Sequence, residues 1–293
     1  MNQRDLPTEA ARSTGWILAV GGALAVVLGL GAHVVMLQGL KVPYPDHAAV
    51  PGVIKFINYW SAAAAAFAFC GLARARLARW SAPLACLVVF TLWSMLKEAL
   101  IRAAVMDGVV TTAWVFSLVS ALPRIVSYLV AGSVVALVGR VTKRWWSMLV
   151  ASLALSLAMI LGIEPMLRAG SGAVLNAISY LAHDEVYTMP YGWEVLVPAF
   201  LTYAEPVIAA FVVAAMIWDQ LSADPLYRAG QFVVLVGAMK GALLPLVMFS
   251  PFLSLSLATA LAAEAQFTLE VIVTAMIVAI AWQLAHPVRP LDR

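Results

Sequence analysis

The stretch GWILAVGGALAVVLGLGAHVVML, residues 15–37, contains no Asp, Glu, Lys or Arg and is long enough to cross a bilayer as a helix. It is too long for the core of an ordinary signal peptide, and it lacks a convincing small-residue cleavage site. Other long runs rich in Leu, Ala and Val follow along the chain. A transmembrane β-barrel would instead require short segments of alternating hydrophobicity. The sequence therefore predicts an all-α, polytopic transmembrane helix bundle.

The composition agrees with this class and excludes several others. Of the 293 residues, 63% are hydrophobic and 11% are charged, whereas a soluble domain carries about 25% charged residues. The net charge of +3 forms no basic patch, so we expect the lipid bilayer as a partner and no nucleic acid. Cys70 and Cys86 lie in apolar runs and are expected to be small core residues rather than a disulfide or a metal pair. The four histidines are scattered, so we expect no metal and no cofactor.

Windows of about 20 apolar residues predict eight spans. These spans are Gly15–Leu37, Val53–Leu72, Ala82–Met106, Ala113–Val138, Met148–Ile163, Val195–Trp218, Gly230–Phe249 and Ser254–Leu284. The long connection from Glu164 to Trp193 contains a partly apolar stretch, Ala173–His183. That stretch is expected either to lie along the membrane surface as a short helix or to pack on the bundle as an ordinary loop helix.

The basic residues predict the orientation of these spans. With the N-terminus inside, the cytoplasmic segments hold eleven of them: Arg4, Arg12, Arg74, Arg76, Arg79, Arg140, Lys143, Arg144, Arg228, Arg289 and Arg293. The outer segments hold only three, which are Lys41, Lys55 and Arg168. We therefore expect a multi-pass protein of a bacterial inner membrane with both termini in the cytoplasm.

The two halves of the chain resemble each other. Met95–Leu100 (MLKEAL) aligns with Ala238–Leu243 (AMKGAL), which places Lys97 opposite Lys240. Tyr59–Phe67 aligns in the same way with Tyr203–Phe211. Residues 1–144 and 145–293 are thus predicted to be two four-span halves of one membrane domain, related by a parallel repeat. The alternative is a chance likeness between two Ala- and Leu-rich sequences.

Ionisable residues inside the predicted spans are the main functional signal, because each costs roughly 3 kcal/mol on insertion. There are four basic and four acidic ones: Lys97, Glu98, Arg102, Arg124, Glu205, Lys240, Glu264 and Glu270. Glu98 and Arg102 are four residues apart, so they are expected to pair on one helical face. At a rise of about 1.5 Å per residue, Lys240 and Glu205 fall near the midplane and most of the others in the outer half. Pro123 and Pro206, each beside a charge, are expected either to free a carbonyl for binding or only to shape the packing.

These charges favour a transporter or permease, with proton coupling as an option and a charged site open toward the outer side. The expected residues for binding a substrate or an ion are Lys97, Glu98, Arg124, Glu205, Lys240, Glu264 and Glu270. The expected ligand is an anionic or amphiphilic small molecule. The first alternative is a non-enzymatic membrane subunit, in which the charges pair with one another or with a membrane-protein partner. The second is an intramembrane lipid-modifying enzyme, for which no nucleophile or metal can be identified in the sequence.

Overall fold

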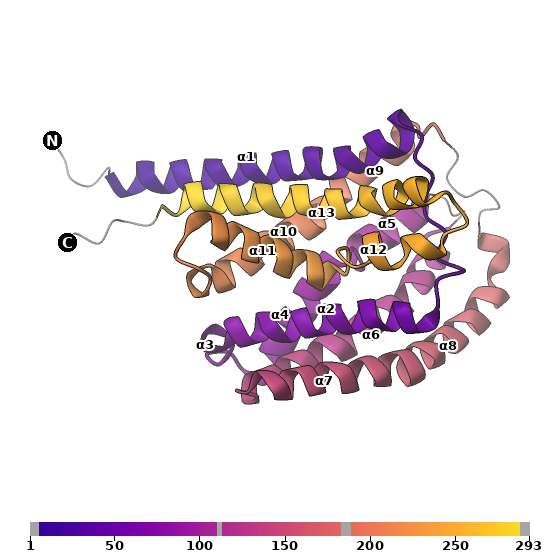
Figure 1. The fold of residues 1–293 in the computed structure, drawn as a ribbon, viewed down its shortest axis with the longest axis horizontal. Coiled ribbons are helices and arrows are strands. Elements are labelled where there is room, and N and C mark those ends of the chain that lie inside the picture. Colours follow the sequence, from indigo (N-terminus) through magenta and orange to yellow (C-terminus); the bar gives the residue numbers. More distant parts are fainter. Residues whose placement is uncertain (1–5, 110–112, 183–188, 288–293) are drawn as a thin grey trace.

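The computed structural model describes residues 6–109, 113–182 and 189–287, and every regular element in these ranges is a helix (Figure 1). The helices of the first half are α1 (Leu6–Val34), α2 (Gly52–Leu72), α3 (Arg74–Leu77), α4 (Ala82–Leu96), α5 (Ile101–Val109) and α6 (Trp114–Val141). Those of the second half are α7 (Trp145–Ala158), α8 (Glu164–Ala177), α9 (Trp193–Thr202), α10 (Ala204–Ile217), α11 (Pro225–Lys240), α12 (Pro245–Met248) and α13 (Leu257–Ala285).

The number of helices that can cross a membrane is six to eight. Six described segments are long and apolar enough on their own: Ser13–Gly39, Gly52–Leu72, Trp114–Val141, Trp145–Ala177, Trp193–Gln220 and Leu257–Ala285. Two helix pairs reach the same standard only together, because each helix alone is too short: α4 with α5, bent by 40°, and α11 with the segment Pro245–Phe252, bent by 61°. These pairs coincide with the third and seventh predicted spans. The prediction of a helical, multi-pass membrane protein is thus confirmed.

The start of α1 and the end of α13 lie at the same end of the molecule (Figure 1). Thr14 Oγ1 donates a hydrogen bond to the carbonyl of Ala285, at 3.5 Å. A chain that begins and ends on one side of a membrane crosses it an even number of times, so both six and eight crossings fit this arrangement.

Helix α1 packs closely along α13 through two of its glycines. A Cβ atom at Gly21 would lie 2.3 Å from the Cβ of Ala281, and one at Gly29 would lie 2.1 Å from Thr274 Oγ1. Gly31, on the same helix, has open space instead. Because hydrocarbon chains give no hydrophobic drive for helix association, such close backbone contact is a main source of stability between spans.

We therefore expect Gly21→Ala to destabilise the protein by about 1–3 kcal/mol, the usual cost of overpacking. The matched control, Gly31→Ala, should be neutral or slightly stabilising because alanine favours helix. Thermal unfolding of the two purified variants measures the difference. Equal effects at the two positions would contradict the close packing of α1 on α13.

Helices α4 and α11 end in the same way. Lys97 directly follows α4 and Lys240 is the last residue of α11, and each lysine precedes a residue of left-handed backbone, Glu98 with φ of 54° and Gly241 with φ of 70°. In each case the next residue donates its N–H five residues back: Ala99 to the Ser94 carbonyl at 2.9 Å, and Ala242 to the Gly237 carbonyl at 3.1 Å. This is the Schellman arrangement, which terminates a helix and turns the chain.

A third discontinuity separates α9 from α10 at Tyr203. Pro206 has no N–H to donate to the carbonyl of Thr202, and its ring crowds that carbonyl, so the helix is interrupted one turn before the proline. The kink predicted at Pro206 is therefore present. Pro123, by contrast, lies inside α6 without ending the helix.

The fifth predicted span is wrong in its extent. Helices α7 and α8 are joined by a π-helical turn at Met159–Ile163, and together they run without a break from Trp145 to Ala177. The wide turn accommodates Pro165, which cannot donate to the helix. The start of the stretch Ala173–His183 is thus the end of a long helix rather than a separate surface helix, and His183 lies outside the described residues.

Candidate functional site

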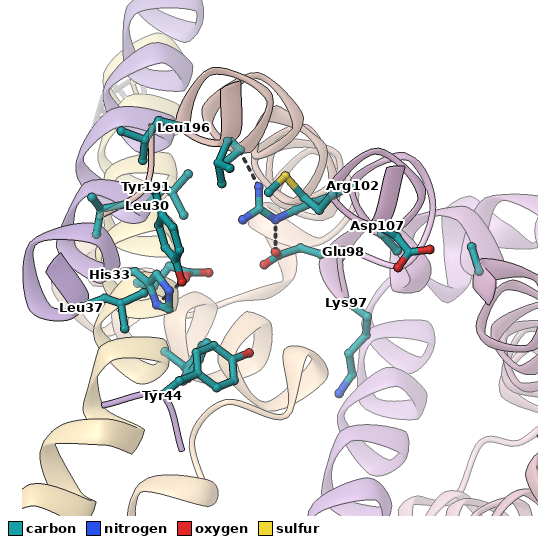
Figure 2. Close-up of a pocket in the computed structure, with 18 of the residues that line it drawn as sticks. Leu30, His33, Leu37, Tyr44, Lys97, Glu98, Arg102, Asp107, Tyr191 and Leu196 are labelled. Carbon is teal, nitrogen blue, oxygen red and sulfur yellow. Dashed lines mark hydrogen bonds and ion pairs between the residues drawn. The ribbon is translucent and has the colours of Figure 1, made fainter. Parts of the chain in front are cut away.

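A cavity of about 700 Å³ lies where the broken helices meet α1, α6 and α13 (Figure 2). We call it the central cavity. Its charged lining residues are Lys97, Glu98, Arg102, Asp107, Arg124, Lys240 and Glu270. Much of the remaining lining is apolar and includes Leu30, Leu37, Phe116, Leu196 and Phe267. The cavity therefore combines a charged part with an apolar part, as a site for an amphiphilic molecule would require.

Four of the charged side chains are linked by ion pairs into one chain, which we call the charge cluster: Arg102, Glu98, Lys240 and Glu270. The Lys240 ammonium contacts both carboxylates, pairing with Glu98 and with Glu270 Oε1, the latter at 2.8 Å. Arg102 Nε lies 2.5 Å from the second oxygen of Glu98. With two cations and two carboxylates the cluster is neutral, which is the condition under which ion pairs persist inside a membrane protein.

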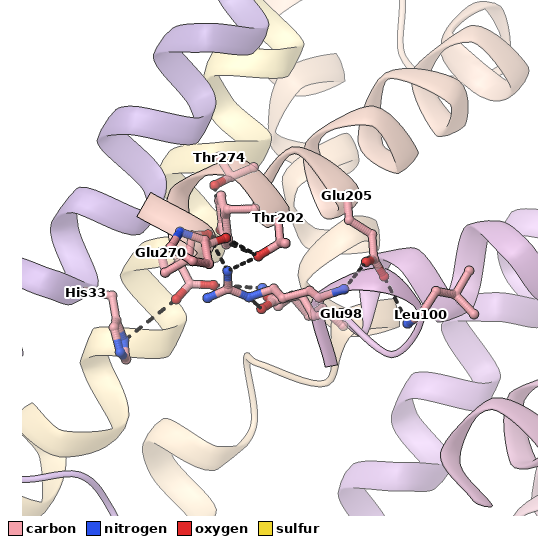
Figure 3. A network of polar contacts seen from close by, with 12 residues as sticks. His33, Glu98, Leu100, Thr202, Glu205, Glu270 and Thr274 are labelled. Carbon is pink, nitrogen blue, oxygen red and sulfur yellow. Dashed lines mark hydrogen bonds and ion pairs between the residues drawn. The ribbon is translucent and has the colours of Figure 1, made fainter. Parts of the chain in front are cut away.

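The surroundings of the charge cluster hold it in place (Figure 3). Arg102 Nη1 also donates to the carbonyl of Ala199 at 2.5 Å and lies 3.2 Å from Thr202 Oγ1, both at the end of α9. The buried ring of Tyr203 lies beneath both cations, 5.3 Å from the guanidinium of Arg102 and 5.4 Å from the ammonium of Lys240. All three helix breaks thus contribute to one polar centre.

The predicted pair of Glu98 and Arg102 is present, but its basis differs from the prediction. The two residues lie on either side of the break between α4 and α5, and they do not share one helical face. Glu98 has a left-handed backbone, which is unfavourable for a residue with a Cβ atom. Its two ion pairs compensate for that conformation and place the carboxylate at the edge of the central cavity.

Lys97 and Arg124 differ from the other two cations of the cavity. Neither makes a hydrogen bond or an ion pair through its side chain with any residue that the structure describes. In Figure 2 the Lys97 side chain points away from Glu98. Its ammonium lies against the second break, since a Cβ atom at Gly241 would be 2.7 Å from Lys97 Nζ. The cavity thus offers two positive charges without an ion-pair partner among the described residues, although Glu164 acts electrostatically on Lys97 from a longer distance.

Glu205 lies outside the lining of the central cavity and does not pair with Lys240. Its carboxylate accepts the backbone N–H groups of Leu100, at 3.1 Å, and Arg102, at 2.6 Å (Figure 3). These are free donors at the start of α5, so Glu205 caps a neighbouring helix across the bundle. Glu205 and Lys240, which were both expected near the midplane, therefore have different partners.

Glu264 also lies away from the central cavity. It is buried, with 2% of its surface exposed, and its Oε1 atom is 2.7 Å from Nε2 of His47. Around it the connection after α1 packs on the start of α13, through an apolar group that includes Val50, Leu253 and Ala263. Five of the seven predicted site residues therefore line one cavity: Lys97, Glu98, Arg124, Lys240 and Glu270.

Several lining residues were missed in the sequence. Asp107 accepts a hydrogen bond from the Ser120 hydroxyl at 2.5 Å, yet it falls one residue beyond the third predicted span. His33 Nδ1 lies 3.7 Å from Glu270 Oε2, but a single histidine in an apolar run gives no signal of its own. Asp107 could be noticed in the sequence only as a further charge beside the end of the third predicted span.

Two tyrosines from connections outside the candidate spans complete the cavity, Tyr44 and Tyr191. Burial raises the pKa of both phenols, and at Tyr44 the charges of Glu270 and Glu98 raise the pKa further. Both hydroxyls therefore stay protonated at physiological pH and are able to donate a hydrogen bond.

The chain was compared with known protein families, with curated proteins and with solved structures, and none of the three comparisons gives a match. The function has to be argued from the geometry and the charges of the central cavity.

Proposed function

We propose that the protein is a transporter or permease for an amphiphilic organic anion, which binds in the central cavity. The observation that carries this proposal is the presence of two cations, Lys97 and Arg124, without a described carboxylate partner in a cavity of about 700 Å³. Lys97 is partly buried and Arg124 is exposed, but both lie within proposed spans, where a cation without a counter-ion is costly. A bound anion would supply the missing charge, and the apolar lining would hold the rest of the molecule.

The broken helices support the same function. Transporters commonly bind their substrates where spans are interrupted at membrane depth, because irregular backbone is tolerated there only if it is buried or faces a cavity. Here the breaks at Lys97–Leu100 and at Gly241–Leu244 both lie beside the central cavity. Each break costs helical hydrogen bonds. A binding site that uses the irregular backbone would explain why the breaks are present.

The proposed architecture has eight spans, with each bent pair counted as one. Both termini are placed in the cytoplasm of a bacterial cell, and the protein in its inner membrane. The excess of Lys and Arg in the connections assigned to the cytoplasm supports this orientation. The position of α1 and α13, with the start of one beside the end of the other, supports an even number of crossings.

The proposed architecture also includes a parallel repeat of two four-span halves. The equivalent left-handed helix ends at Lys97-Glu98 and Lys240-Gly241 support it, since they recur 143 residues apart together with their backbone hydrogen bonds. Helices α6 and α13 begin at Trp114 and Leu257, which is again 143 residues apart. Such matched breaks are harder to obtain by chance than a likeness in composition.

Proton coupling, if present, would involve Glu270. It is the carboxylate of the charge cluster that lies beside His33, and it lines the central cavity. Glu205 and Glu264 have fixed roles at the start of α5 and beside His47. They are therefore less suited to exchange a proton with a substrate.

The alternative function, a membrane subunit of a larger assembly, is favoured by the charge cluster alone. Its ion pairs are mutually satisfied, so Lys240 and Arg102 need no ligand. A purely structural network would, however, leave the central cavity and its two unpaired cations without a role. We therefore rank the transporter first.

Alternating access to the cavity separates the two functions. Ala103 lines the cavity, so we expect Ala103→Cys, with Cys70 and Cys86 replaced by alanine, to react with a membrane-impermeant thiol reagent from either side of the membrane. The measurement is the labelling rate in right-side-out and inverted vesicles.

Two exposed positions provide the controls and test the orientation. Ala48→Cys should react only from outside and Ala78→Cys only from inside. Labelling of Ala103→Cys from one side alone, or from neither, would favour the subunit over the transporter.

A further inference from the structure

A second polar hollow of about 380 Å³ lies between α2, α6 and α8. Its lining residues are Tyr59, Ser120, Pro123, Arg124, Ser127, Tyr128, Glu164, Arg168 and Ser171. None of these belongs to the charge cluster. Ser120 and Arg124 line both this hollow and the central cavity, so the Arg124 side chain stands at the boundary between the two.

The hollow is built from two polar stripes that face each other. On α6 the residues Ser120, Arg124 and Ser127 recur at intervals of four and three, and on α8 Glu164, Arg168 and Ser171 do the same. This spacing puts each set on one side of its helix. Because polar side chains are costly within membrane-spanning helices, two aligned polar stripes around a hollow indicate a site for a polar ligand.

The hydrogen-bonding capacity of this hollow is only partly used within the protein. Ser171 donates to the Arg168 carbonyl at 3.2 Å, and Arg168 pairs with Glu164 at 3.3 Å. Among the described residues, however, no hydrogen bond is made by the hydroxyls of Tyr59, Ser127 and Tyr128 or by the guanidinium of Arg124. Three hydroxyls and one cation therefore remain available in a single small space.

We infer that this hollow binds a hydroxylated organic anion, such as a sugar acid or a phosphorylated polyol. The guanidinium of Arg124, which also lines the central cavity, would here donate two parallel hydrogen bonds to a carboxylate or phosphate, and Lys97 would remain the cation of the central cavity. The three hydroxyls both donate and accept, as the hydroxyls of a polyol also do. A simple apolar anion would leave these groups unpaired, and for this reason the ligand of the second hollow differs in class from that of the central cavity.

This chemistry occurs both in free solutes and in lipid headgroups, for example in glycerol phosphate and in phosphatidylglycerol. Calorimetry measures the binding of free solutes, gluconate and glycerol phosphate, to the full-length protein in phosphatidylcholine nanodiscs. The titration is then repeated in nanodiscs that contain phosphatidylglycerol. If the lipid headgroup occupies the site, it lowers the apparent affinity for glycerol phosphate. An unchanged affinity assigns the site to the free solute.

The decisive variant is the double change Tyr59→Phe with Tyr128→Phe, which removes two hydroxyls and keeps the rings. We expect it to weaken gluconate or glycerol phosphate binding by about tenfold, because two hydroxyls that hydrogen-bond the ligand are removed. Tyr180→Phe, at a tyrosine that is 78% exposed outside the hollow, is the matched control and should have no effect. Unchanged binding in the double variant, or no binding of either probe to the wild-type protein, would overturn the inference.

Failure of this inference is distinguishable from failure of the proposed transport function. Hexanesulfonate, an anion without hydroxyls, tests the central cavity in the same nanodiscs. Its binding should depend on Lys97 and not on the two tyrosines, and gluconate should show the opposite dependence. If the tyrosine variant lost the binding of both gluconate and hexanesulfonate, the hollow would not be a separate site.

Discussion

Replacing Lys240 with methionine is expected to lower the free energy of unfolding by about 3–5 kcal/mol, the usual cost of removing one partner from a buried ion pair. The ammonium of Lys240 contacts both carboxylates of the charge cluster. Glu98 would keep its pair with Arg102. Glu270, which is 5% exposed, would keep only His33, whose Nδ1 atom lies 3.7 Å away. The variant therefore leaves a buried negative charge almost uncompensated.

The double variant Lys240→Met with Glu270→Gln tests this reason. It removes both charges, so most of the lost stability should return, and the thermodynamic cycle gives the coupling between the two residues. Thermal or denaturant unfolding of the purified protein is the measurement. Lys143→Met, at an exposed lysine just after the end of α6, is the control and should change the stability little. A stable single variant, or a double variant without recovery, would contradict the charge cluster.

The same substitution at Lys97 is expected to spare the stability of the protein and to reduce uptake. Lys97 has no described hydrogen-bond or ion-pair partner to strand, so Lys97→Met should be neutral or stabilising. It should nevertheless reduce uptake of an amphiphilic anion by about tenfold or more, since a charged hydrogen bond is worth roughly 1.5–3 kcal/mol. Unfolding and uptake measured on one preparation separate the two effects.

The sequence alignment places the two lysines opposite each other. This contrast tests whether Lys240 has a structural role and Lys97 a binding role. If Lys97→Met destabilises the protein as strongly as Lys240→Met, Lys97 has a structural role and the unpaired cation is not a binding group. The membrane-subunit function would then be the better explanation of the charged residues.

Helix positions could be predicted from the sequence because membrane-spanning helices need long apolar runs, and these runs are easy to recognise. The breaks within the helices were harder to predict from the sequence. The interruption at Tyr203 follows from Pro206, a strong local signal. The break after Lys97 has no such signal, because Glu98 adopts a left-handed backbone through contacts with Arg102 and Lys240 that come from tertiary structure. The long helix through Pro165 was missed since a π-helical turn absorbs the proline.

The charged residues of the site could be found in the sequence, but their partners could not. The sequence placed Glu205 and Lys240 at a similar depth, yet depth does not fix the direction in which a side chain points around its helix. The structure directs Glu205 to the start of α5 and Lys240 to Glu98 and Glu270. Glu164, Arg168 and Ser171 on α8 were assigned to an outer connection. Their position opposite the polar residues of α6 was therefore not predicted.

The most direct test of the central claim is the initial rate of uptake of alkyl sulfonates into proteoliposomes. Butane-, hexane- and octanesulfonate stay ionised and do not cross a bilayer as neutral acids, so uptake reports the protein. We expect a rate above that of protein-free liposomes for the wild type, and a loss of about tenfold or more in Lys97→Met with its fold intact. Uptake that equals the protein-free rate for every sulfonate, or that Lys97→Met leaves unchanged, would contradict it.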